Sequence, residues 1–193
     1  MEHAGWAVAR ASQRLLPAPS SPILIACGTG FNGGDGLAAA RHLHDWGYPL
    51  RLVLAGRADR LREEPAVYAA ILSRLGVSLV ESASLRVEQL TQWMAESGVI
   101  IDALLGVGAS GAVREPLASW IRCMNESGKP IVAVDIPSGL DGDTGEVRDV
   151  AVRATVTVSF GLPKRGSLVR EGPAHVGSLL VDSISIPHTL LTP

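Results

Sequence analysis

The segment Ile23–Leu43, ILIACGTGFNGGDGLAAARHL, decides the fold because its character changes twice. An apolar run at residues 23–27 is followed by a glycine-rich stretch at residues 28–36, and a helical pattern begins at residue 37. A buried strand, a tight turn and a helix in this order are typical of a parallel α/β sheet. Glycines allow a tight turn, and the free N–H groups at the start of a helix attract anions. The segment therefore predicts a phosphate site where the helix begins.

The spacing of the glycines is consistent with a dinucleotide, but the surrounding sequence is not that of an ordinary redox domain. Gly28, Gly30 and Gly33 match the G-x-G-x-x-G fingerprint. An acid that binds the ribose is expected about 20 residues later, yet residues 50–57 contain none. The absence of a following Gly-Lys-Ser/Thr excludes a Walker A loop. Two interpretations stay open: a phosphate-binding loop, or a glycine-rich turn in which Asp35 caps the helix.

Length and composition indicate one globular domain over residues 1–193. The chain is 47% hydrophobic and 19% charged, with no break in composition. A net charge of −2 with dispersed Lys and Arg lacks the footprint of a DNA-binding protein. No apolar run is long enough to span a membrane, and no targeting signal precedes the first helix. Two scattered cysteines, Cys27 and Cys123, are typical of a reducing compartment, which predicts a cytoplasmic protein.

Strand-like and helical patterns alternate through the first two-thirds of the chain, which predicts an open, mostly parallel sheet with helices on both faces. The late strands are separated by a loop with Gly and Pro rather than a clear helix, so the sheet is expected to finish differently from how it starts. The expected strands are residues 23–27, 50–55, 99–101, 131–134, 155–160 and 178–186, and the expected helices are residues 1–16, 37–43, 63–75, 85–96 and 115–127.

Polar residues follow the central strands. Asp102 and Asp135 each come at the carboxyl end of an apolar strand, and such ends meet at one edge of a parallel sheet. Taken singly, each aspartate is most simply a cap for backbone N–H groups. Together with Asn32, Asp35 and Ser138 they form an oxygen-rich set, which suits a hard cation.

Four motifs in order resemble those of the YjeF N-terminal domain family, whose enzymes are NAD(P)HX epimerases. They are residues 28–36, residues 102–108, residues 134–141 and the later stretch FGLPKRG at residues 160–166. The likeness runs over nearly the entire chain. It implies a Rossmann-like α/β fold, a three-layer αβα sandwich, and epimerisation at C6 of hydrated NADH or NADPH, which is a cofactor-repair reaction. It also implies one potassium ion per subunit.

The resemblance assigns roles to individual positions. Its potassium ligands fall on Asn32, Asp102 and Ser138. Its substrate-binding positions are Phe31, Asn32, Gly33, Gly34, Asp35, Gly106, Val107, Gly108, Ala109, Ser110, Gly111, Ala112 and Asp135.

The chain departs from the family pattern in two places. Phe31 stands where the family usually has an asparagine, and the family usually has a further segment before residues 1–5. Many bacterial relatives continue into a dehydratase domain, so the resemblance implies a dehydratase partner, fused or separate, and it leaves a homodimer open.

A carbon that bears a hydroxyl beside a ring nitrogen can invert by loss and readdition of water, which needs an acid/base group. We expect Asp135 to be that group and Asp102 to be committed to the ion. Lys164 has two interpretations, a contact to phosphate or Asp135 and a solvated loop lysine, and Arg57 is a candidate for a 2′-phosphate. Two other functions stay open. One is a non-catalytic nucleotide- or RNA-binding scaffold, as in messenger-RNA decapping scaffolds, and the other is an oxidoreductase, supported by the glycine fingerprint alone.

Overall fold

The computed structural model describes residues 1–190 and contains a seven-stranded sheet in the order β3-β2-β1-β4-β5-β6-β7. The strands are β1 (Ile23–Cys27), β2 (Leu50–Leu54), β3 (Leu79–Glu81), β4 (Val99–Ala103), β5 (Ile131–Val134), β6 (Val156–Phe160) and β7 (Ser178–Asp182). Every neighbouring pair in the sheet is parallel. The α/β fold with a parallel sheet is therefore confirmed.

Helices cover both faces of the sheet. The α-helices are α1 (Glu2–Leu15), α2 (Phe31–Asp45), α3 (Glu63–Arg74), α4 (Val87–Glu96), α5 (Leu117–Glu126) and α6 (Gly172–Val176). The 3-10 turns are η1 (Ala58–Arg60), η2 (Ser82–Ser84), η3 (Arg165–Ser167) and η4 (His188–Leu190). Within residues 1–190 no helix is long and apolar enough to cross a membrane.

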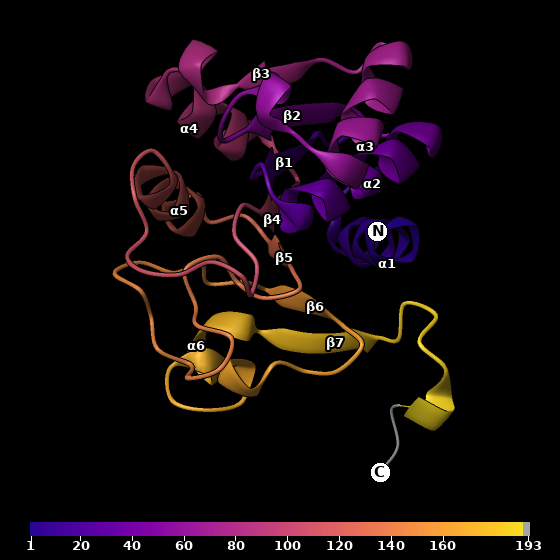
Figure 1. Ribbon diagram of the computed structural model, residues 1–193. Coiled ribbons are helices and arrows are strands. Elements are labelled where there is room, and N and C mark those ends of the chain that lie inside the picture. Colours follow the sequence, from indigo (N-terminus) through magenta and orange to yellow (C-terminus); the bar gives the residue numbers. More distant parts are fainter. Residues whose placement is uncertain (191–193) are drawn as a thin grey trace.

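Alternate residues of the central strands feed two separate cores, which gives three layers. In β1, Ile23 and Ile25 pack with α1, α2 and α3, whereas Leu24 and Ala26 pack with α4 and α5. Figure 1 shows α1, α2 and α3 on one side of the sheet and α4 and α5 on the other. Because both faces of the central strands β1, β4 and β5 are covered, these strands are almost uniformly apolar, as the sequence predicts.

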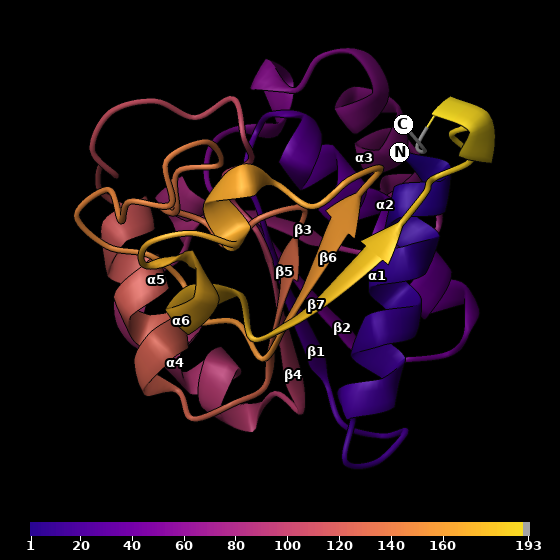
Figure 2. The same cartoon turned by 90° about the horizontal axis from the view of Figure 1, so that it is seen from below.

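The order of the strands places a crevice between β1 and β4. The chain leaves β1 toward β2 and β3 on one side, and then returns through β4 to build the other side. Ala26 and Cys27 of β1 pair with Asp102 and Ala103 of β4, so the loops after these strands begin side by side. Figure 2 shows the loops at the end of the sheet where the arrowheads point. Ligands bind at such a switch point in open α/β sheets.

The end of the sheet differs from the prediction. We expected a change of architecture after residue 155, but β6 and β7 are parallel like the other strands. Their connection contains the turn η3 and the short helix α6, and β7 ends at Asp182 rather than at residue 186. The half-buried β3 was not predicted, because three residues are too few to show a period.

Helix α2 begins at Phe31, six residues before the apolar pattern starts, and this changes the role of the glycines. A Cβ atom on Gly33 would lie 1.9 Å from the carbonyl oxygen of Gly28, and one on Gly36 would lie 2.5 Å from Cβ of Ala103. These glycines let the helix approach the sheet closely. The helix cap is Gly30, with no side-chain hydrogen bond, so the interpretation of Asp35 as a cap is wrong.

Candidate functional site

A cavity of about 580 Å³ opens at the crevice between β1 and β4. It lies between the start of α2, the loop after β4 and the end of β5. Eight residues assigned from the family pattern line it: Phe31, Asn32, Asp35, Gly106, Val107, Gly108, Ala109 and Asp135. Phe31 is 60% exposed, so the aromatic ring that replaces the usual asparagine stands at the rim.

A second cavity of about 360 Å³ adjoins the first. The two share four lining residues, Leu105, Gly106, Ala109 and Leu117. The remaining loop positions assigned to the substrate line this second cavity, namely Ser110, Gly111 and Ala112. Gly33 and Gly34 are buried and line neither cavity; a Cβ atom on Gly34 would lie 2.5 Å from the side chain of Met1.

A hydrogen-bond network brings together the three residues assigned to the ion. Asp102 is fully buried and accepts hydrogen bonds from the backbone N–H of Ser138 at 2.8 Å and from its hydroxyl at 2.5 Å. The Ser138 hydroxyl oxygen accepts from the N–H of Leu105 at 2.9 Å, and the amide of Asn32 donates to the carbonyl of Leu105 at 3.1 Å. Leu105, which sequence reasoning did not single out, thus joins the other three.

Two groups in this network suit a cation, the buried carboxyl of Asp102 and the amide oxygen of Asn32. Burial raises the pKa of Asp102 to about 6, although the hydrogen bonds from Ser138 and Leu104 lower it. The Oδ1 atom of Asn32 is buried and has no hydrogen-bond partner among the described residues. An unpaired buried oxygen costs about 1–3 kcal/mol. It is therefore a ready ligand.

The donor set fits a monovalent hard ion. Within residues 1–190 no three His, Cys, Asp or Glu side chains cluster closely enough to hold a metal ion. The ligands on offer are one carboxylate, one amide and one hydroxyl, and a divalent ion usually recruits more carboxylates. The residues present therefore fit the potassium ion that the family pattern implies.

Asp135 is held in place by Lys164. It adopts a left-handed backbone conformation, with φ of 66°, directly after β5. Its Oδ1 atom accepts hydrogen bonds from the N–H of Phe160 at 3.0 Å and from the ammonium group of Lys164, which also donates to the carbonyl of Phe160 at 2.9 Å. The side chains of Asp135 and Lys164 are 14% and 18% exposed. Lys164 contacts Asp135, so the interpretation as a solvated loop lysine is wrong.

Asp35 is a second carboxyl on the same cavity. Burial raises its pKa to about 7, the amino group of Met1 at 4.0 Å lowers it, and the charge of Asp135 raises it again. Asp35 and Asp135 both line this cavity. Two carboxyls with different environments are a common arrangement for proton transfer.

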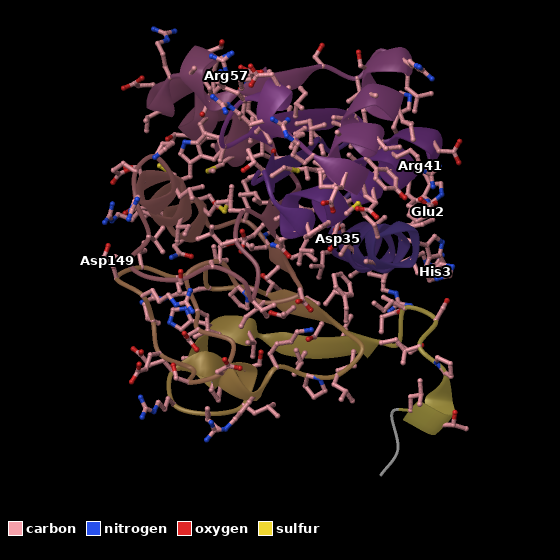
Figure 3. The ribbon with its side chains drawn as sticks, viewed as in Figure 1. Glu2, His3, Asp35, Arg41, Arg57 and Asp149 are labelled. Atoms are coloured by element: carbon pink, nitrogen blue, oxygen red, sulfur yellow. The ribbon has the colours of Figure 1, made fainter. Side chains whose placement is uncertain are left out.

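Arg57 lies outside both cavities. It is 66% exposed and its guanidinium is bound to Asp59, with hydrogen bonds of 2.6 and 3.1 Å. Figure 3 shows Arg57 well separated from Asp35, which lies near α1 and α2. The suggested role of Arg57 in binding a 2′-phosphate therefore gains no support from its position.

Sequence reasoning missed Arg148, which ties two loops together. Its guanidinium is bound to Asp141 and donates to the carbonyl of Ala109. The Asp141 carboxylate also accepts hydrogen bonds from the N–H groups of Asp143 and Thr144, so Asp141 stabilises a turn. These contacts lower the pKa of Asp141, and the hydrogen bond from Arg148 is the main cause. No local sequence pattern indicates that Arg148 reaches a residue 39 positions earlier.

Comparison with known proteins shows the family to which the chain is similar. A family model described as the YjeF-related protein N-terminus matches residues 1–166. Proteins named bifunctional NAD(P)H-hydrate repair enzyme Nnr from Pyrobaculum aerophilum and Thermofilum pendens are 50% and 40% identical over 97% and 99% of the chain. The chain spans only 37% and 36% of their lengths.

The crystal structure of the yeast protein ynu0 superimposes with a TM-score of 0.81 at 29% sequence identity. The alignment covers 96% of this chain and 79% of the yeast chain. Sequence, family model and fold agree, and the chain belongs to the YjeF-related protein N-terminus family.

Proposed function

We propose that the chain interconverts the R and S forms of hydrated NADH and NADPH at C6, a nicotinamide-cofactor repair reaction. The observation that carries the proposal is the pair of carboxyls, Asp35 and Asp135, on one cavity at the switch point of the sheet. The names of the relatives, which are NAD(P)H-hydrate repair enzymes, support the same substrate class.

The reaction needs one proton to be given and one to be taken. The C6–oxygen bond breaks as the hydroxyl receives a proton and leaves as water, while the electron pair of the ring nitrogen stabilises the cation. Water then adds to the other face of the ring and loses a proton. Asp135, paired with Lys164, is the acid/base group, and Asp35, which can hold a proton near neutral pH, is its partner across the cavity.

Asn32, Asp102 and Ser138 would hold a potassium ion. The ion would fix the relative positions of the segments that carry them, because Asn32 lies in the first turn of α2, Asp102 near the end of β4 and Ser138 in the segment after β5. The chain's own network through Leu105 already brings the three side chains together.

The test is incubation of the protein with pure R or S NAD(P)HX, followed by chromatographic separation of the epimers. Asp135→Asn should lower kcat about 100- to 10,000-fold with a much smaller change in KM, because the amide keeps the size of the side chain but cannot exchange the proton. Asp143→Asn, at an exposed turn near the same loops, serves as the matched control and should behave as the wild type.

Other outcomes would point elsewhere. Equal losses in kcat and binding would make Asp135 a binding residue only. Hydride exchange with a second substrate would favour an oxidoreductase, and wild-type protein without either activity would favour a scaffold. Because the relatives are named bifunctional and this chain spans about a third of their length, we also propose that it works with a dehydratase, fused or separate.

A further inference from the structure

The ionisable side chains that line the two adjoining cavities are of opposite sign. The ionisable residues that line the larger cavity are both acids, Asp35 and Asp135. Those that line the smaller cavity are both bases, Arg114 and Arg148. Lys164, the cation beside the larger cavity, is already engaged by Asp135. A substrate with one uncharged end and several phosphates would therefore be oriented by this difference.

The two arginines are not equivalent. Arg148 is bound to Asp141 and to the carbonyl of Ala109, so its charge is balanced and its position is structural. Arg114 is exposed and makes no ion pair or side-chain hydrogen bond with any residue from 1 to 190 that the structure describes. The adjacent Glu115 is bound to Arg122 instead, at 3.3 Å.

The loop between the cavities is open to an incoming ligand. A Cβ atom on Gly108 or on Gly111 would meet no protein atom within 4 Å. Arg148 holds this loop, residues 106–113, against the segment after Gly139. The guanidinium of Arg148 donates to the carbonyl of Ala109, and the backbone carbonyl of Arg148 accepts a hydrogen bond from the N–H of Val113 at 3.4 Å. The loop thus has a fixed path with free space beside it, and Arg114 lies at its end.

We propose that Arg114 binds a phosphate group of the dinucleotide in the smaller cavity, while the uncharged hydrated nicotinamide ring occupies the larger cavity beside Asp35 and Asp135. This inference rests on the proposed function and assigns an orientation to its substrate. An arginine without a partner is suited to a phosphate because its fork of N–H groups can bind two oxygens. The phosphate is either one of the pyrophosphate or the 2′-phosphate of the NADPH form.

The test is a calorimetric titration of the wild type, Arg114→Ala and Arg114→Lys with NADP and with NAD. Arg114→Ala should weaken the binding of NADP about tenfold or more. Arg114→Lys should lose less affinity, because lysine keeps the positive charge but lacks the fork of N–H groups. An equal loss for NAD and NADP identifies the pyrophosphate, whereas a loss for NADP alone identifies the 2′-phosphate. The loss should shrink at high salt.

Arg153→Ala is the matched control, since Arg153 is an exposed arginine that lines neither cavity. It should bind both dinucleotides as the wild type does. Unchanged affinities in Arg114→Ala, or a wild type that binds neither dinucleotide, would overturn the inference. The titration is independent of turnover, so a protein that epimerises NAD(P)HX with Arg114→Ala unchanged refutes the orientation alone, and a protein that binds through Arg114 without turnover refutes the epimerase alone.

Discussion

Asp35 couples the stability of the fold to pH because its carboxyl is largely buried beside a second carboxylate. Burial raises the pKa of the Asp35 carboxyl in the folded protein to about 7, against 3.8 for the free side chain. The folded state therefore keeps a proton that the unfolded chain loses, and the free energy of unfolding falls as pH rises from about 4 to about 7. A shift of this size corresponds to roughly 4 kcal/mol.

Asp35→Asn should remove this dependence, since the amide is neutral at every pH. The variant should be more stable than the wild type at pH 8, and the difference should vanish near pH 4. Urea unfolding at the two pH values measures it. Glu64→Gln, an exposed acid on a small cavity next to Asp35, is the control and should show no such change. A constant difference between wild type and Asp35→Asn at both pH values would contradict the burial argument.

At the scale of elements, the start of helix α2 contains one glycine that is needed for packing and one that faces open space. Gly33 is pressed against the backbone of Gly28, whereas a Cβ atom on Gly30 would meet nothing within 4 Å. Gly33→Ala should therefore lower the free energy of unfolding by about 1–3 kcal/mol or more through overpacking. Gly30→Ala should fold nearly as well as the wild type, with a loss of at most about 1 kcal/mol at the helix cap.

Dinucleotide binding should respond in the opposite order. Gly30 lines the larger cavity at the start of α2, so an added methyl group there obstructs an approaching ligand. Thermal melting and a NADP titration on both variants give the comparison. If Gly30→Ala bound NADP as tightly as the wild type, the start of α2 would lie outside the binding surface.

At the scale of the whole molecule, an ion bound by Asn32, Asp102 and Ser138 would connect the first turn of α2, the end of β4 and the segment after β5. Because such an ion binds only the folded chain, it stabilises the fold by RT ln(1 + [L]/Kd). We expect a higher melting temperature in potassium chloride than in tetramethylammonium chloride at equal concentration. The difference should shrink in Asn32→Ala, which removes the unpaired Oδ1 atom.

The control for this measurement is Asn125→Ala. Asn125 is also hydrogen-bonded to loop backbone, at Ala151 and Arg153, but it lies outside the network of Asp102. The variant should lose stability equally in both salts and keep the potassium effect. Identical melting curves of the wild type in the two salts would contradict potassium binding by Asn32, Asp102 and Ser138.

The sequence by itself determined the order of the central strands and of the long helices, and the edge at which the site lies. Buried parallel strands are apolar throughout, so β1, β4 and β5 are legible as short continuous runs. Asp102 and Asp135 could be expected at one edge because the carboxyl ends of parallel strands meet there. The sequence did not show that β7 continues the parallel sheet, since the helix before it is a single short turn.

Only the tertiary structure decided which residues of the glycine loop pack and which face a ligand. Gly30 and Gly33 look alike in sequence, but a Cβ atom on Gly33 would clash with the backbone of Gly28, whereas one on Gly30 would meet nothing within 4 Å. The tertiary structure alone also decided the surroundings of the unpaired oxygen of Asn32, whose amide contacts a residue 73 positions away, and of Arg114 and Arg148, which meet at one cavity. Periodicity records what each segment buries, whereas partners distant in the chain are fixed only when the sheet brings their loops together.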